Sequence, residues 1–489
     1  MSSRTIILTL TFIAAAVPAF GQYRPIPDQT QQYYRQHTNG PGISTPSTQF
    51  IHAPVLNDPM CSECQTPPIQ YLKEEYDAHL SPHVWGPAVL QGIRTAPQWA
   101  PRALIHAENK VIETTPRLLV GLENDIIRGA NGTARALGIT GFYGSAEVMR
   151  WSTNSPSVQP LITTSVAGTA QGDAGVLGQP GTSVLFGGEL FEDTRNGGRY
   201  TGGIVFQGAQ RFMLEAIYTR IGTDSLAFRA DGDATSIVAR PFFNSTISEE
   251  DSRLVAFPGF VDGRVDITGS SKFDTLQIAL RRSAGRVFGL NTDYTIGYRE
   301  ADLSDTLRIL DISNSLSGGT AGARFEVRDE FRTENSFDGI EFGLISRLQP
   351  NNRFFVDVLG KVALGRSSQQ VTVDGRTITR PAGGDRTGVD GGLLTQPTNI
   401  GRFNDSGFAA IFEFGTTLRY RFNSNVQGLL GYTFLAWSDV ARAANQLDDT
   451  VNTTQFDGGA LVGDPRPLFR MDTGQFTAHG LRLGVQISF

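Results

Sequence analysis

The chain has 489 residues and a net charge of −6, from 48 acidic and 42 basic side chains. This acidic balance gives no electrostatic support for nucleic-acid binding, so no nucleic-acid partner is expected. Hydrophobic residues make up only 39% of the chain, glycine occurs 55 times, and beyond the N-terminus no run of about 18 apolar residues occurs. These numbers exclude a bundle of transmembrane helices and suit a chain rich in β-strands.

Residues 1–21 have the composition of a secretory signal peptide. Arg4 supplies a positive charge, an apolar core follows, and the sequence Ala-Phe-Gly ends at a predicted cleavage site before Gln22. We therefore expect the chain to be exported.

Residues 22–140 are rich in Gln, Pro and Ser/Thr at their start. Since this composition offers little apolar surface to offset the entropy of ordering, we predict a weakly structured periplasmic segment. A proline and a shared apolar face indicate one possible short helix over residues 68–80.

Both cysteines of the chain, Cys61 and Cys64, lie in this segment. Together with His79 and His83 they have a spacing close to that of a zinc site. Neighbouring prolines and the lack of apolar residues to pack around such a site disfavour zinc. A local disulfide or a pair of exposed thiols is the preferred interpretation in an exported chain, and no metal or cofactor is predicted.

From residue 141 to residue 489, apolar and polar residues alternate. The period of two predicts strands with one apolar face, as where Phe412 and Phe414 alternate with Glu413. Several of these segments exceed the ~5–6 residues of a typical globular strand and match the ~9–11 residues that cross a bilayer. We predict ten strands, at residues 143–151, 198–207, 211–221, 272–282, 286–299, 336–348, 353–366, 407–422, 426–437 and 475–489.

The connections between these strands alternate in length. Four are tight, at residues 208–210, 283–285, 349–352 and 423–425. Five are long, at residues 152–197, 222–271, 300–335, 367–404 and 438–473. Short turns at one end and long loops at the other are typical of outer-membrane barrels. We therefore predict an all-β fold, a transmembrane antiparallel up-and-down β-barrel of about 10 strands (10–14), with long extracellular loops, short periplasmic turns and both ends of the chain in the periplasm.

The last strand, residues 475–489, is amphipathic and ends in Phe489. A closed barrel satisfies every backbone hydrogen bond in lipid, so this strand should pair with the first. A terminal aromatic residue on such a strand resembles the signal that bacterial outer-membrane assembly machinery reads. Outer-membrane lipid and that machinery are the partners we expect; the oligomeric state is not predicted.

Several stretches in this order carry a family resemblance. They are GSAEVMRW at 144–151, VLGQPGTSVLFGGE at 176–189, FFVDVLGKVALGRSSQQVTVDG at 354–375, LLGYTFLAWSDVARAANQLDDTVN at 429–452 and DPRPLFRMDTGQFTAHGLRLGVQISF at 464–489. The chain from about residue 141 resembles the seventh of the bacterial families described as putative outer-membrane β-barrel porins. The resemblance implies a barrel in the outer membrane with porin activity, and it assigns no catalytic or binding residues.

The polar faces of the predicted strands carry charges of both signs, which are the candidate lumen-lining residues. They are Asp293, Arg299, Glu341, Arg347, Asp357, Lys361, Glu413, Arg419, Arg421 and Arg482. Such charges can pair into a filled interior, which ten strands favour, or line a wet constriction. One or two further hairpins, with residues 182–189 and 323–331 as candidates, would favour the open pore.

We expect a porin, a passive channel for small solutes. The alternative is a non-conducting structural or adhesive anchor with a filled lumen.

The long loops are expected to continue the barrel outwards in part as strand pairs. Residues 371–379 predict a hairpin around Asp374-Gly375. No enzymatic activity is expected, because His479 is the only histidine in the predicted barrel and lies on an apolar face, in an interfacial position.

Overall fold

The computed structural model describes residues 138–191, 194–206, 212–233, 235–349 and 351–489. The predicted signal peptide, the possible helix over 68–80, Cys61, Cys64 and the tight turn at 208–210 lie outside the described residues. Among the described residues, no helix is both long enough and apolar enough to cross a membrane.

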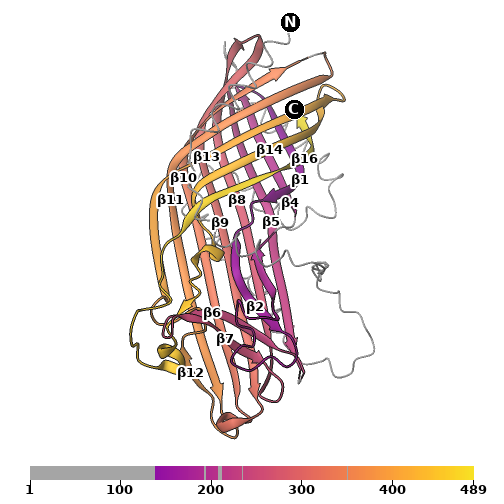
Figure 1. Cartoon of the computed structure of the whole chain (residues 1–489). Coiled ribbons are helices and arrows are strands. Elements are labelled where there is room, and N and C mark those ends of the chain that lie inside the picture. The colour runs from indigo at the N-terminus through magenta and orange to yellow at the C-terminus, as the bar shows by residue number, and fades with distance from the viewer. Residues whose placement is uncertain (1–137, 192–193, 207–211, 234, 350) are drawn as a thin grey trace. The chain divides into compact units, whose positions relative to one another are not determined.

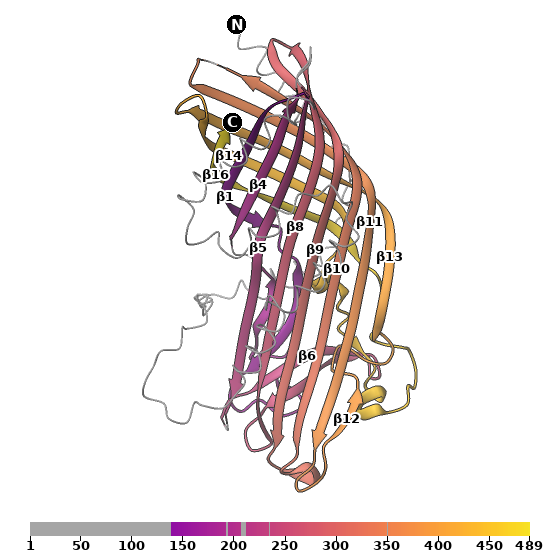
Figure 2. The same cartoon turned by 180° about the vertical axis from the view of Figure 1, so that it is seen from behind.

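Ten strands form a closed antiparallel barrel, in which each strand pairs with its neighbours in chain order (Figures 1 and 2). In ring order they are β1 (Ile139–Thr153), β4 (Arg195–Phe206), β5 (Phe212–Gly232), β8 (Val261–Val287), β9 (Leu290–Ser315), β10 (Arg324–Leu348), β11 (Phe354–Arg380), β13 (Gly401–Arg421), β14 (Val426–Ala441) and β16 (Thr473–Ser488). The predicted fold class, an up-and-down transmembrane barrel of about ten strands, is confirmed.

The barrel closes where β16 pairs with β1, from the pair Tyr143 and Ser488 to the pair Thr153 and Ala478. Phe489 extends this seam, because its N–H donates to the carbonyl of Phe142 at 2.8 Å and its carbonyl accepts from the Phe142 N–H at 3.2 Å. The last residue of the chain thus belongs to the hydrogen-bonded wall.

The outer wall has an apolar belt near the tight-turn end. On β10 the outward-facing Ile340, Phe342 and Leu344 are 57%, 46% and 58% exposed. From Ile340 to Leu348, eight steps of ~3.4 Å each at a tilt of ~40° span about 21 Å, close to the ~25 Å apolar band of such barrels. We call this surface the lipid belt.

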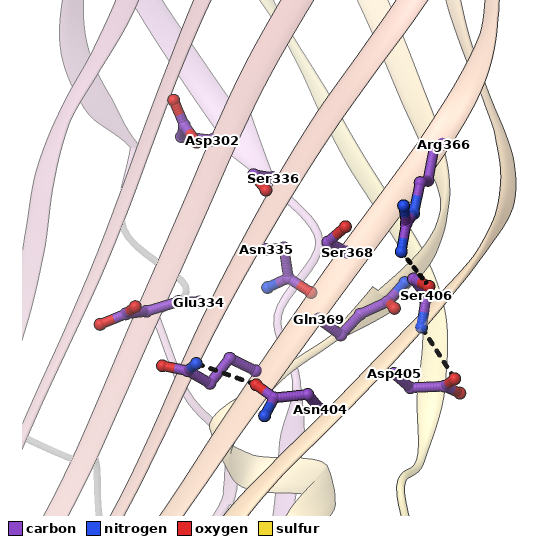
Figure 3. Close-up of a pocket in the computed structure, with 11 residues that line it drawn as sticks. Asp302, Glu334, Asn335, Ser336, Arg366, Ser368, Gln369, Asn404, Asp405 and Ser406 are labelled. Carbon is purple, nitrogen blue, oxygen red and sulfur yellow. Dashed lines mark hydrogen bonds between the residues drawn. The ribbon is translucent and has the colours of Figure 1, made fainter.

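Above the lipid belt the two faces of the strands exchange polarity. On β10 the outward positions become Asp338, Ser336, Glu334 and Arg332, while the inward-facing Phe337 and Phe331 are fully buried. Figure 3 shows the polar outward side chains of this region on β9, β10, β11 and β13. The inversion follows from the surroundings, because the outer wall passes from lipid to water while the interior is filled by protein.

Strands β8 to β11 are 25–27 residues long, whereas β1, β4, β14 and β16 have 12–16 residues. Much of the predicted loops 222–271, 300–335 and 367–404 is therefore strand that continues the barrel wall outwards. The β9–β10 connection shrinks to residues 316–323, with the short 3₁₀ turn η2 (Gly318–Thr320). The expectation of a long loop here is wrong, because alternation continues with its faces reversed.

A smaller sheet packs on the inner face of this extension, forming what we call the head. Its strands are β2 (Ser157–Ser165), β3 (Thr182–Glu189), β6 (Val238–Asn244), β7 (Glu249–Ala256) and the short β15 (Thr450–Val451). Ile162, Phe242 and Val255 from this sheet share one core with Ile309 and Phe331 of the wall. The two candidate extra hairpins add no barrel strands, because residues 182–189 form β3 of the head and residues 323–331 belong to β10 and the turn before it.

A buried arginine fixes the head to the wall. Arg240 of β6 donates to Asp311 of β9 at 2.8 Å and to Asp329 of β10 at 2.5 Å, and all three side chains are at most 1% exposed. Asp329 also accepts from the N–H groups of Leu394 and Thr395, both at 2.9 Å. Burial alone would lower the pKa of the Arg240 guanidinium, but the two carboxylates hold it above its usual value.

The remaining described elements are short. They are β12 (Thr387–Asp390), which pairs with the end of β11, and the 3₁₀ turns η3 (Ala443–Gln446) and η4 (Thr453–Gly458) between β14 and β16.

The β8–β9 turn lies at Phe288-Gly289 rather than at 283–285 as predicted. Both turn residues have positive φ, 52° and 81°, which a two-residue type I′ hairpin requires. Gly285, also at positive φ (80°), instead produces a bulge in the β8–β9 register. A glycine does mark the turn, but it is Gly289 and not Gly285.

The predicted hairpin around Asp374-Gly375 is wrong, because β11 runs straight through to Arg380 and pairs with β10 along this length. Gly375 serves packing rather than turning, since a Cβ there would overlap the side chain of Thr395. The Gly391 N–H donates to the Gly375 carbonyl at 3.0 Å, so the glycine lets the 391–395 segment lie directly on the strand.

Candidate functional site in the barrel interior

Six buried side chains meet at the centre of the barrel and form what we call the central ion cluster: Arg199, Gln277, Arg299, Glu341, Lys361 and Glu413. They come from β4, β8, β9, β10, β11 and β13, because every second residue of a strand points inwards. All are at most 5% exposed.

Glu413 is the hub of the central ion cluster. It accepts from Arg199 at 2.8 Å, from Arg299 at 2.9 Å and from Gln277 at 3.1 Å. Glu341 accepts from Arg299 at 3.1 Å and from Lys361 at 2.9 Å, and the Lys361 ammonium also donates to Gln277 at 2.6 Å. Because each charge has a partner of opposite sign, the cluster links six strands across the lumen without a lone buried charge.

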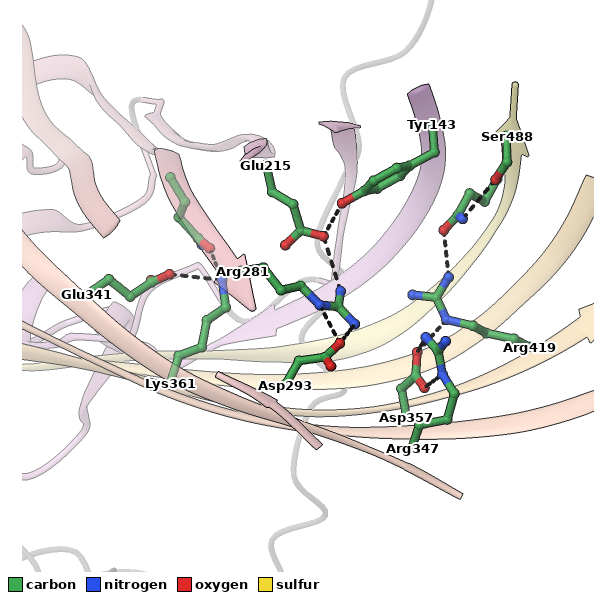
Figure 4. A network of polar contacts seen from close by, with 12 residues as sticks. Tyr143, Glu215, Arg281, Asp293, Glu341, Arg347, Asp357, Lys361, Arg419 and Ser488 are labelled. Carbon is green, nitrogen blue, oxygen red and sulfur yellow. Dashed lines mark hydrogen bonds and ion pairs between the residues drawn. The ribbon is translucent and has the colours of Figure 1, made fainter. Parts of the chain in front are cut away.

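A charged vestibule of about 380 Å³ lies between the central ion cluster and the tight-turn end. In Figure 4 the carboxylate of Glu215 lies between the Tyr143 hydroxyl and Arg281, and Arg281 also bonds Asp293 at 2.8 Å. A second group joins Arg347 and Arg419 to Asp357. Arg347 donates to both carboxylate oxygens, at 2.6 Å and 2.9 Å, and Arg419 donates to one of them at 2.6 Å. Six cations and four carboxylates line this space: Arg199, Arg281, Arg347, Lys361, Arg419 and Arg482, with Glu147, Glu215, Asp293 and Asp357.

An apolar layer crosses the barrel on the other side of the central ion cluster. Every barrel strand except β4 contributes to it, and its side chains are at most 3% exposed. The aromatic members pack together: the ring centroids of Phe273 and Phe476 are 5.1 Å apart, and those of Phe337 and Trp437 are 6.1 Å apart. The full layer is Met149, Trp151, Ile221, Phe273, Ala301, Leu303, Phe337, Ala363, Ala409, Ile411, Leu435, Trp437, Val440, Phe476 and Ala478.

The chain after β14 closes the layer from the loop end. Asn335 donates to the Ala441 carbonyl at 2.8 Å and accepts from the Ala441 N–H at 2.7 Å. Arg442 is paired with Asp305, and its guanidinium lies 5.6 Å from the ring centroid of Phe476. The segment that follows the strand is thereby held inside the barrel wall.

One family model, described as Putative beta barrel porin-7, matches residues 143–489. The chain belongs to this family. A comparison with curated proteins finds no match.

Solved barrels resemble this member of the porin-7 family only remotely. The outer membrane protease OmpT from Escherichia coli is 8% identical, with 72% of this chain and 99% of that chain covered and a TM-score of 0.34. The translocator domain of the autotransporter NalP from Neisseria meningitidis is 11% identical, with 76% and 97% covered and a TM-score of 0.16. A Pseudomonas aeruginosa FadL homologue is 8% identical, with 71% and 90% covered and a TM-score of 0.19.

The structure brings most of the candidate lumen residues of this porin-7 family member together. Arg299, Glu341, Lys361 and Glu413 lie in the central ion cluster. In the vestibule lie Asp293, Arg347, Asp357, Arg419 and Arg482. Arg421 lies apart from both groups, with its guanidinium 4.5 Å from the ring centroid of Phe355 near the turn after β13.

Sequence reasoning missed five polar lumen residues, Glu147, Arg199, Glu215, Gln277 and Arg281. All lie within predicted strands and share the parity of the inward positions, so the period of two extended to every strand would have found them.

His479 lies on the outward face of β16, where its ring centroid is 6.1 Å from that of Tyr432. This position is on the opposite side of the wall from the lumen charges.

Proposed function

We propose that the protein is a closed outer-membrane barrel that anchors a folded head on the outside of the cell. The observation that carries the proposal is the apolar layer. Side chains that line a water-filled pore stay accessible to solvent, whereas Trp151, Phe273, Phe337, Trp437 and Phe476 are at most 2% exposed. A buried aromatic layer seals the interior as a domain core does.

The position of the lipid belt supports this assignment of sides. Tight turns lie at the vestibule end and the head lies at the other end, which is the order of an outer-membrane barrel with its loops outside. We also propose that the outer-membrane assembly machinery recognises β16 and Phe489, which lie at the closing seam of the barrel. We propose no enzymatic role.

A passive channel for small solutes is the second candidate. The vestibule favours it, because a space of about 380 Å³ lined by charges of both signs is already open below the central ion cluster. Conduction would require the central ion cluster and the apolar layer to separate, and the head above them to admit a path.

Planar-bilayer recording of the purified full chain separates the two functions. The closed anchor gives folded insertion without stepwise currents. A variant with Phe273, Trp437 and Phe476 all replaced by Ala is the comparison, because it removes three of the five large aromatic side chains of the apolar layer and replaces no residue of the lipid belt or of the central ion cluster. Stepwise currents from the wild-type chain would support the channel and overturn the anchor.

A further inference from the structure

A polar groove of about 520 Å³ lies on the outer wall just above the lipid belt, a volume in the ~300–1,000 Å³ range of small-molecule sites. A row of short polar side chains crosses it, because Ser336 of β10 pairs with Ser368 of β11 and Ser368 pairs with Ser406 of β13 (Figure 3). Asp302 of β9, opposite Ser336, ends the row.

A second row, two residues farther from the lipid belt, forms one rim of the groove. Here Glu334 pairs with Gln370, and Gln370 pairs with Asn404, to whose side chain it donates at 2.9 Å. Ser336, Ser368 and Gln370 are half-buried, while the longer Glu334 and Asn404 are exposed. The groove thus has a floor of short polar side chains and, on the side away from the lipid belt, a rim of longer polar ones.

Several floor and rim groups remain available for hydrogen bonds. In the described part of the chain, the side chains of Ser336, Ser368 and Glu334 make no hydrogen bond to another group. Asn404 uses its Oδ1 for Gln370 and keeps its amide N–H₂. Hydroxyls, an amide and a carboxylate together can donate to and accept from neighbouring hydroxyl groups of a ligand.

The depth of the groove points to a headgroup rather than an acyl chain. One row of residues, which we call the boundary row, lies between the groove and the lipid belt. In it Arg366 pairs with Phe408, which is 75% exposed. Ser336 stands four residues beyond Ile340, which is about 10 Å along the membrane normal at ~3.4 Å per residue and ~40° tilt. The polar zone of a leaflet is only about 5–8 Å deep, so the groove lies at its outer edge and beyond.

The charges of the groove disfavour phosphate. Asp302, Glu334 and Asp405 supply three carboxylates against one guanidinium, Arg366, which donates to Ser406 at 2.8 Å. Burial and the carboxylates of neighbouring residues raise the pKa of Asp302, so a further negative charge, such as that of a phosphate, is unfavourable there. Among the described residues, no group of three acidic, His or Cys side chains could hold a metal ion, which disfavours a bridging cation.

We propose that this groove binds the saccharide headgroup of a neutral glycolipid in the outer leaflet. The lipid tail lies against Phe408 of the boundary row and against Leu364, which pairs with Ile340 in the lipid belt. The sugar hydroxyls reach the serine row and the Glu334–Asn404 rim. The site is on the outer wall, so it does not depend on whether the lumen conducts.

The test uses the full chain in phosphatidylcholine nanodiscs that contain a small fraction of either digalactosyldiacylglycerol or phosphatidylglycerol. Mass spectrometry of the lipid that stays bound after mild detergent exchange measures retention. Ser368→Phe fills the floor, and Thr268→Phe, on the exposed outer face of β8 and away from the groove, is the matched control. Glu334→Gln with Asn404→Ala removes rim contacts without filling the groove, and heat-modified gel mobility checks that each variant is folded.

We expect the wild-type chain and Thr268→Phe to retain the galactolipid, and Ser368→Phe to lose about tenfold in retention, equivalent to ~1.4 kcal/mol. The rim variant should lose several-fold, while Arg366→Gln should change little. If the wild-type chain retains phosphatidylglycerol as well as it retains the galactolipid, and Arg366→Gln retains less phosphatidylglycerol, the ligand is a phosphate and the proposal is overturned. Equal galactolipid retention in Ser368→Phe, no enrichment in any chain, or equal binding of free digalactose without lipid tails would overturn it as well.

Discussion

Replacement of Glu413 by Gln should destabilise the folded barrel by about 3–5 kcal/mol, the usual cost of breaking a buried ion pair. Glu413 is 1% exposed and neutralises both Arg199 and Arg299. At an effective dielectric constant of ~20, each pair of charges ~4 Å apart interacts by about 4 kcal/mol, part of which offsets desolvation. Gln also places an N–H₂ group towards one of the three donors that now point at Glu413, which are Arg199, Arg299 and Gln277. The similar shape of Gln therefore does not restore the lost stability.

The size of this effect depends on whether the lumen is closed. In a wet pore, water would screen the two guanidinium groups and the same substitution would cost only about 0–1 kcal/mol. Urea unfolding of the barrel in lipid vesicles, followed by tryptophan fluorescence, measures the change in unfolding free energy. Glu300→Gln, an exposed outward carboxylate next to Arg299 in β9, is the matched control and should stay within about 0.5 kcal/mol of wild type. A Glu413→Gln loss below about 1 kcal/mol would refute the dry central ion cluster.

Three further predictions concern the head and the outer wall. Arg240→Met should cost about 3–5 kcal/mol and expose the head to limited proteolysis, because it leaves the buried Asp311 without its nearest cation; unchanged proteolysis would contradict this. Gly375→Ala should cost about 1–3 kcal/mol in urea unfolding, because its methyl group would overlap Thr395. The pKa of Asp302 is raised in the folded chain, so ionisation of its carboxyl removes stability as the pH rises through that pKa. Asp302→Asn should therefore make the barrel more stable than wild type at pH 7, and this gain in unfolding free energy should disappear towards pH 3. A gain that does not depend on pH would count against the raised pKa.

The barrel could be predicted from the sequence because lipid imposes a period of two on every strand. Phe412, Phe414 and Leu418 face out while Glu413 and Arg419 face in, and this contrast identifies a strand with no knowledge of its neighbours. The same parity placed the charges now found in the central ion cluster on the inward face. What parity could not give was their pairing, because the partners of Glu413 come from strands up to 214 residues away.

The extension beyond the membrane was harder to predict, because its strands keep the period but exchange faces. On β10 the outward face changes from Ile340 to Asp338 while Phe337 turns inwards, so a search for a constant apolar face ends there. The apolar layer was missed for a related reason: Phe273, Trp437 and Phe476 lie on the inward face, which was expected to be polar. Gly375 was misassigned because a glycine required by tertiary packing has the same sequence signature as one required by a turn.

The sealed lumen is tested most directly by thiol accessibility. With Cys61 and Cys64 both replaced by Ser, one new cysteine is introduced at Ala478, which lies in the apolar layer at 0% exposure, or at Ser145, which lines the vestibule. A small charged methanethiosulfonate is added to the folded chain in lipid vesicles, and labelling is followed by mass spectrometry. The closed barrel predicts prompt labelling of Ser145→Cys and none of Ala478→Cys until the chain is unfolded; labelling of both at similar rates would show that water crosses the barrel.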